Sequence, residues 1–240
     1  MKDTIALFTT CMVDQMFPEI GVAAVNLLRR TGRKVAFPPE QTCCGQPFYN
    51  SGFWPQARDL AKATIQALEP YHAVVIPGGS CAGMIRVEYA HLFEDQPDWR
   101  VRAAALGAKT FEFSEYLAAN LTLSPKSEQP TPVTYHDSCH MLRVAGIKHQ
   151  PRQLLEQVGC QITEMRESER CCGFGGLFSV KMQPVSKAMT AEKLSQANQT
   201  ATGLLVTSDP GCLMQMRANQ PLGDPLRIDH LAVVLEELAA

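Results

Sequence analysis

The sequence has no excess of charge of either sign and no long apolar run. Its 22 lysines and arginines are nearly balanced by 24 acidic residues, which gives a net charge of −2. Proteins that bind nucleic acid usually concentrate positive charge on one surface. The near balance of basic and acidic residues therefore argues against a nucleic-acid partner. No apolar stretch approaches the roughly 18 residues that a membrane helix needs, and no transmembrane segment is predicted.

Two common cofactor signatures are also missing. The chain has no Walker A sequence, and the glycine-rich run 173–178 (GFGGLF) departs from G-x-G-x-x-G at its last position, which disfavours a nucleotide site. The C-x2–4-C knuckles of structural zinc modules are absent as well. The apolar run 5–8 is short and gives way to polar residues, so we expect no signal peptide and predict a cytoplasmic protein.

The chain does have nine cysteines, and eight of them form a repeated pattern. It reads C-x31-CCG-x35-C and then C-x31-CCG-x38-C. In a cytoplasmic protein, cysteines spaced this regularly indicate metal ligands rather than disulfides. The candidate metal ligands are Cys11, Cys43, Cys44, Cys81, Cys139, Cys171, Cys172 and Cys212.

The same order of elements is predicted around each set of cysteines. Short apolar strands are expected at 5–8, 35–37 and 73–76, and again at 133–135, 161–165 and 203–206. Helices are expected over 18–30, 55–69, 151–158 and 185–198, with a last helix that Asp229 caps and that runs to Leu238.

Alternating strands and helices predict an α/β fold. We expect two tandem pseudo-symmetric repeats, each a small parallel sheet with flanking helices, at 1–124 and 133–240. A polar segment that contains prolines, 125–132, is the predicted linker. The cysteine turns follow the carboxyl ends of the strands, where ligand sites of such sheets form, so we expect one four-thiolate site per repeat.

Four thiolates can close a zinc site or hold a [4Fe–4S] cluster. Vicinal cysteines are awkward for one small ion but can reach neighbouring irons of a cluster. The pattern therefore favours one [4Fe–4S] cluster per repeat, with zinc as the alternative. Cys160 lies outside the pattern, and we expect it to be a buried structural thiol.

Glycines and histidines beside the cysteines are candidate cofactor-binding residues. His136 and His140 flank Cys139 and could ligate, relay a proton or donate a hydrogen bond to cluster sulfur, and we favour a supporting role. Glycine lets the backbone approach a bulky group closely. The candidates of this type are Gly45, Gly173, Gly175 and Gly176.

With these residues the chain resembles the CCG-domain (cysteine-rich) iron–sulfur family. That family includes the cysteine-rich subunits of heterodisulfide reductase and of anaerobic glycerol-3-phosphate dehydrogenase, and the lactate-utilisation protein A group. The resemblance covers nearly the whole chain and is strongest to the last group, through 136–140 (HDSCH), 151–155 (PRQLL) and 171–176 (CCGFGG).

The resemblance implies an iron–sulfur electron-transfer subunit, non-catalytic or co-catalytic, in a complex that oxidises L-lactate to pyruvate. Its implied partners are other iron–sulfur and small subunits of that complex. The fullest family motif ends in C-x-x-C, but here Met84 and Gln215 stand at the closing positions. This departure argues against a five-thiolate cluster and the disulfide-cleaving chemistry linked to it. A thiol–disulfide oxidoreductase and a zinc-bound scaffold remain the alternative functions.

Overall fold

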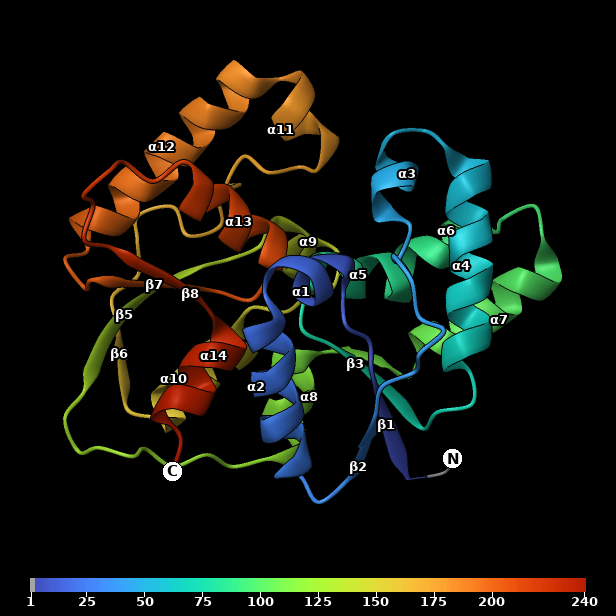
Figure 1. Ribbon diagram of the computed structural model, residues 1–240, viewed down its shortest axis with the longest axis horizontal. Helices are drawn as coiled ribbons and strands as arrows, with labels where there is room; N and C mark the ends of the chain where they lie inside the picture. Colours follow the sequence, from blue (N-terminus) through green and yellow to red (C-terminus); the bar gives the residue numbers. More distant parts are fainter. Residues whose placement is uncertain (1–2) are drawn as a thin grey trace.

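The computed structural model describes residues 3–240, so Met1 and Lys2 of the predicted first repeat lie outside the described residues. The chain forms two four-stranded parallel sheets with the strand orders β2-β1-β3-β4 and β6-β5-β7-β8 (Figure 1). The equal strand order and the flanking helices confirm the predicted α/β fold of two tandem repeats. No helix in the range 3–240 is long and apolar enough to cross a membrane.

The first sheet and its helices come from the first half of the chain. The strands are β1 (Thr4–Leu7), β2 (Lys34–Ala36), β3 (Ala73–Ile76) and β4 (Thr110–Glu112). The helices are α1 (Cys11–Met16), α2 (Pro18–Arg29), α3 (Gln46–Asn50), α4 (Trp54–Leu68), α5 (Gly79–Gly83), the π-helix η1 (Met84–Glu88), α6 (Tyr89–Leu92), α7 (Pro97–Gly107) and α8 (Phe113–Asn120).

The second half repeats this plan. Its strands are β5 (Thr131–His136), β6 (Cys160–Ile162), β7 (Leu204–Thr207) and β8 (Arg227–His230). Its helices are α9 (Cys139–Arg143), α10 (His149–Gln157), α11 (Leu177–Lys181), α12 (Gln183–Gln199), α13 (Pro210–Ala218) and α14 (Leu231–Leu238).

Side chains of the first sheet alternate between two cores, as the period of a strand requires. In β1, Ile5 and Leu7 point into a core that contains residues from both halves of the chain. Ala6 and Phe8 point to the opposite face, into a second core under α4, α6 and α7. Both faces of this sheet are therefore buried, which explains why its central strands read as continuous apolar runs.

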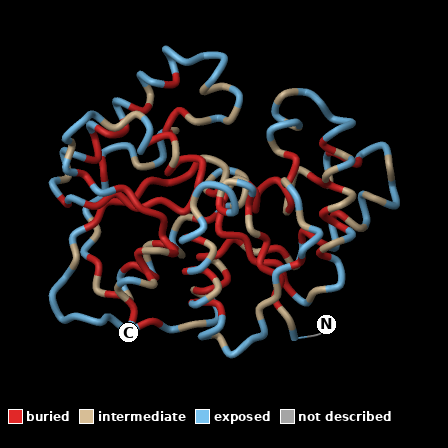
Figure 2. Tube along the Cα trace, viewed as in Figure 1, coloured by how far each residue is buried: buried red, intermediate tan, exposed pale blue. Residues whose placement is uncertain are grey.

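The shared core lies in a layer of four helices between the two sheets. Helix α2 packs against α14, and α8 packs against α10 (Figure 1). Buried stretches run through both sheets and along the inner sides of these helices (Figure 2). The two repeats are thus joined by a common apolar interior.

The segment between the repeats is held by backbone hydrogen bonds to the end of the chain. Lys126 N donates to Leu238 O at 2.9 Å, and Ala240 N donates to Ser124 O at 2.9 Å. Strand β5 begins at Thr131, so it includes the last two residues of the predicted 125–132 linker. The repeat boundaries themselves stay a prediction.

The start of the last helix differs from the expectation. Asp229, the predicted cap of this helix, lies in β8, where it pairs with Arg217 and Arg227. The cap is His230, whose Nδ1 accepts a hydrogen bond from Ala232 N at 3.1 Å. Two arginines therefore hold the Asp229 carboxylate in the edge strand, and the helix begins one residue later.

Strand β4 ends in a carboxyl group that should make folding depend on pH. Glu112 is fully buried, and burial raises its pKa to about 8 from an ordinary 4.5. Between these two values the folded chain holds a proton that the unfolded chain has lost, so stability falls as pH rises through this window. We expect Glu112→Gln to flatten this dependence, and Glu128→Gln, at an exposed glutamate, to keep it. Urea unfolding at pH 5 and pH 8.5 measures the change in stability. The same change in wild type and in Glu112→Gln would contradict the prediction.

Candidate metal centre

The cysteines of each half follow the carboxyl ends of three of its strands. Cys11 begins α1 just after β1, and Cys81 lies in α5 just after β3. Cys139 and Cys212 occupy the same places after β5 and β7. The CCG turns follow the edge strands β2 and β6. Because parallel strands end at one edge, the three turns of each half converge.

Within each set the thiols contact one another. Cys44 Sγ lies 3.3 Å from Cys81 Sγ, and Cys43 is hydrogen-bonded to both Cys11 and Cys44. The second set has the same connections: Cys171 is hydrogen-bonded to Cys139 and Cys172, and Cys172 to Cys212. The two sets of four match in every contact.

The contacts concentrate negative charge on one sulfur per set. Hydrogen bonds from Cys11 and then Cys44 lower the pKa of Cys43 to about 3. Hydrogen bonds from the Cys139 and Cys172 thiols lower the pKa of Cys171 to about 2. Backbone N–H groups add to this effect, since Gly45 N and Gly173 N each lie 3.4 Å from the sulfur two residues earlier. Each set therefore contains a preformed thiolate, the form of cysteine that binds metal.

Both sets line one cavity of about 160 Å³ at the junction of the two halves. Figure 1 shows α1, α5, α9 and α13 gathered there, and α5 packs against α9 as α1 packs against α13. Asp209 links the halves: its Oδ2 accepts from Ser80 N at 2.8 Å, while its Oδ1 accepts from Gly211 N and Cys212 N. The sequence predicted two separate sites but not that they share a cavity.

The donor chemistry of each set fits a metal centre. Each set offers four cysteine sulfurs, and soft thiolate donors suit zinc and iron–sulfur clusters better than magnesium or calcium. Cys44 and Cys172 are 2% and 1% exposed, whereas Cys11 is exposed and Cys139 is half-buried, so a bound group would have a buried side and a side nearer to water. The four sulfurs of each set are therefore compatible both with a zinc ion and with an iron–sulfur cluster.

The glycines divide into two kinds. Gly45 and Gly173 have φ angles of +85° and +93°, and a Cβ there would lie 3.3 Å from Ala57 O and 2.5 Å from Ser186 O. These two glycines let the CCG turns lie against α4 and α12. Gly175 and Gly176 line the cavity instead. The cofactor-binding role of all four stays a prediction.

His136 lies beside the second set at the end of β5. It is fully buried, and neither ring nitrogen has a hydrogen-bond partner among residues 3–240. One of its nitrogens and the sulfurs of Cys172 and Cys212 all lie within 4.8 Å of one another. Burial lowers the pKa of His136 to about 4. His140 lines the cavity from α9.

The closing positions of the full family motif contain no metal donor directed at the cavity. Met84 is fully buried in the second core of the first half, the one under α4, α6 and α7, which we call the outer core. Gln215 Nε2 donates to Ser186 Oγ at 2.9 Å and to Thr190 Oγ1 at 2.8 Å. Cys160 lies in β6 within the shared core, and burial raises its pKa to about 11, in keeping with a structural thiol.

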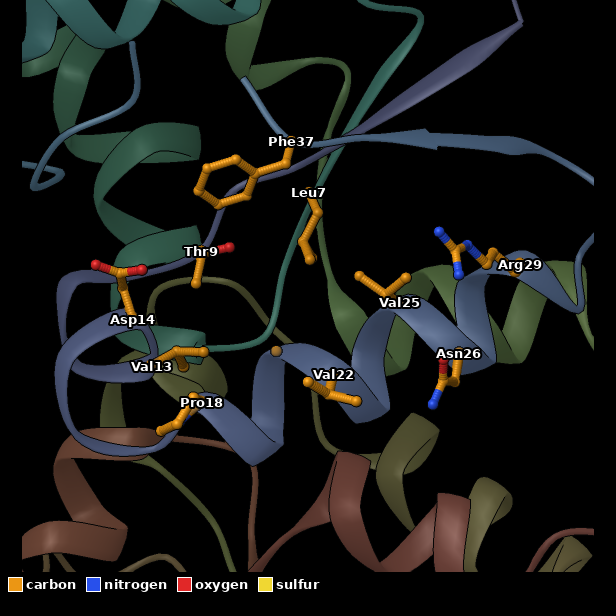
Figure 3. Close-up of a pocket in the computed structure, with 11 residues that line it drawn as sticks. Leu7, Thr9, Val13, Asp14, Pro18, Val22, Val25, Asn26, Arg29 and Phe37 are labelled. Atoms are coloured by element: carbon orange, nitrogen blue, oxygen red, sulfur yellow. The ribbon is translucent and has the colours of Figure 1, made fainter. Parts of the chain in front are cut away.

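A second hollow, a groove of about 350 Å³, runs along α2. Apolar side chains such as Val22, Val25 and Phe37 line it, and Asp14 and Arg29 lie at its two ends (Figure 3). No cysteine or histidine is among its lining residues. The shared thiol cavity is therefore the candidate centre.

Comparison with known proteins agrees with this geometry. The cysteine-rich domain named CCG matches residues 5–86 and 133–217, one copy in each half. The chain belongs to the CCG cysteine-rich family. Two similar CCG-family relatives are both named lactate utilization protein A. The one from Geobacillus kaustophilus is 42% identical over 234 residues, covering 96% of this chain and 98% of the relative. The one from Halalkalibacterium halodurans is 44% identical over 234 residues, covering 96% of each.

A solved structure, that of a hypothetical protein from Helicobacter pylori, has a related fold. It matches 97% of this CCG-family chain with a TM-score of 0.70 and 10% sequence identity. The match covers 48% of that longer protein, so this chain spans about half its length. At this identity the likeness extends to the fold alone.

Proposed function

We propose that this chain is an iron–sulfur electron-transfer subunit of a system that oxidises L-lactate to pyruvate. Each repeat would hold one [4Fe–4S] cluster, the first through Cys11, Cys43, Cys44 and Cys81 and the second through Cys139, Cys171, Cys172 and Cys212. The observation that carries the proposal is the convergence of these eight cysteines on one cavity in two matching sets. The names of the relatives point to lactate utilisation.

Such clusters take up and release single electrons when bound. The chain's own residues would fix the two centres next to each other, since Asp209 joins the turn that carries Cys81 to the turn that carries Cys212. Backbone N–H groups of Gly45 and Gly173 would continue to neutralise ligand sulfur. Two adjacent centres in one cavity suit a subunit that relays electrons.

We place the chemistry on lactate in a partner subunit. The shared cavity measures about 160 Å³, below the roughly 300 Å³ at which small-molecule sites begin, and cysteines occupy much of its lining. Other iron–sulfur and small subunits would complete the complex in the cytoplasm. A thiol–disulfide reductase fits less well, because Met84 is buried in a core and Gln215 is hydrogen-bonded within α12 and α13.

Metal analysis tests the proposal and separates it from a zinc scaffold. Protein purified without oxygen should contain about eight irons and eight sulfides per chain and give an EPR signal after dithionite reduction. Zinc without sulfide, even after reconstitution with iron and sulfide, would overturn the electron-transfer function. The lactate assignment has its own test. A deletion strain should fail to grow on L-lactate but grow on pyruvate, and normal growth on L-lactate would contradict it.

A further inference from the structure

The two centres have matching ligands but unequal surroundings. Equivalent positions can be read from the repeated pattern: Phe8 and His136 each lie three residues before the first cysteine of their set. Helices α4 and α12 take equivalent places in the two halves: Gly45 of the first CCG turn lies against Ala57 O in α4, and Gly173 of the second lies against Ser186 O in α12. At several equivalent positions the two halves differ in the polar groups that they place beside their centre.

The second centre has two buried nitrogen groups that the first lacks. His136 stands where the first half has Phe8; its ring has no hydrogen-bond partner among residues 3–240, and one ring nitrogen lies within 4.8 Å of the Cys172 and Cys212 sulfurs. Seven residues beyond Ser186 stands Lys193, where the first half has Thr64.

Lys193 is a fully buried cation. Its Nζ donates to the backbone oxygens of Glu167 and Ser168, the latter at 3.2 Å. Its charge interacts with the sulfurs of Cys172 and Cys212. Burial lowers its pKa to about 8, which leaves the ammonium group protonated at neutral pH.

The first centre has no charged side chain at these positions, which hold Phe8 and Thr64. Phe8 and Met84 are fully buried in the outer core, and Ala57 stands where the second half has Ser186. Each half places hydroxyls on its CCG turn: Tyr89 donates to Cys44 O at 2.8 Å, while Thr190 donates to Cys172 O at 2.7 Å and Ser186 to Gly173 O at 2.8 Å. These hydroxyls are uncharged and bond to backbone oxygens, whereas the lysine and the histidine act on the sulfurs of the second centre.

The two carboxylates nearest the second centre are each held by donors that neutralise part of their charge. Asp137 precedes the second set, but Arg152 binds both of its oxygens at 2.8 Å. Asp209 accepts from backbone on both sides of the cavity, next to Cys81 and at Cys212 itself. Its charge acts on Cys139 and Cys212, but the backbone N–H groups of Ser80, Gly211 and Cys212 neutralise part of it. Lys193 is the buried cation specific to the second centre.

We propose that Lys193 and His136 give the centre of the second repeat the higher reduction potential, so that an electron shared by the two centres rests there. Reduction adds one negative charge to a centre, and a buried ammonium group and an imidazole N–H both stabilise that added charge. The transfer moves one electron from the reduced first centre to the oxidised second one, and no bond forms or breaks. This inference rests on the proposed iron–sulfur function.

Redox titration of the anaerobically purified protein, followed by EPR, tests the order of the two potentials. Cys44→Ala and Cys172→Ala assign each signal, because each should leave the other repeat's centre in place. We expect the higher potential in the second repeat. A higher potential in the first repeat, or equal values, would overturn the inference. A chain without sulfide would instead overturn the proposed function, so the two failures can be told apart.

Two substitutions test the residues themselves. Lys193→Met should lower the potential of the second centre by about 59 mV, a tenfold change in a one-electron equilibrium, and leave the first unchanged. His136→Phe, which copies the first repeat, should act in the same direction. Lys187→Met removes an equal charge from the exposed side of α12 and serves as the control. Equal shifts of both centres, or none, at normal iron content would contradict the assignment.

Discussion

Cys172→Ala is expected to remove one of the two metal centres and about half of the bound iron and sulfide, four of about eight atoms of each. Cys172 is 1% exposed and contacts Cys171 and Cys212, so no other described thiol of the second repeat can take its place. Because metal binding contributes directly to folding, the unfolding temperature should fall as well. Iron and sulfide analysis with thermal unfolding measures both effects.

Cys160→Ala is the matched control for this change. Cys160 is also buried in the second half, but it lies in β6 within the shared core and outside both thiol sets. The variant should keep the full metal content and lose only the small stability of a buried thiol group. Full iron content in Cys172→Ala, or half in Cys160→Ala, would show that the ligand set is wrong.

Gly79→Ala is expected to force the two repeats apart at the cavity. A Cβ at Gly79 would lie 2.5 Å from Met141 Cβ, so α5 and α9 could not keep their present distance. Overpacking of this kind costs about 1–3 kcal/mol, and here we expect the upper end. Because α5 carries Cys81 and α9 begins at Cys139, the metal content of both repeats should fall together. Urea unfolding and iron analysis measure the two results.

Gly83→Ala tests whether the expected losses in Gly79→Ala come from the steric contact with Met141. Gly83 lies in the same helix, but its Cβ would be 3.4 Å from the nearest atom, Val144 Cγ1, which is an ordinary contact. Alanine is also a better helix former than glycine by about 1 kcal/mol. We therefore expect Gly83→Ala to be neutral or slightly stabilising. Equal losses in the two variants would mean that helix α5 itself, and not its packing on α9, is sensitive.

The parts of the fold that the sequence predicted well are those with a strong local signal. Strand β3 is four apolar residues long and lies between a polar turn and a cysteine turn, and the structure places it at the expected residues, 73–76. Helix α2 begins at Pro18 as expected. The convergence of the cysteine turns also followed from local order, because parallel strands end at one edge.

The missed features depend on contacts that no short pattern encodes. Strand β8 contains Arg227 and Asp229, and it is a strand because it pairs with β7 along its length. Lys193 lies in a long helix whose sequence does not mark it as buried; the backbone oxygens of Glu167 and Ser168 accept hydrogen bonds from its Nζ. The shared cavity arises from packing between halves, which two identical motifs alone could not predict.

The layer formed by α2, α8, α10 and α14 means that one repeat cannot bury its apolar surface by itself. In one repeat by itself, the inner faces of α2 and α8 would lose α14 and α10 and expose residues such as Ile20, Leu27 and Leu117 to water. A lone repeat would therefore need a second copy to cover them. Two copies of one repeat would carry two identical centres, whereas two repeats in one chain can carry different residues around each centre.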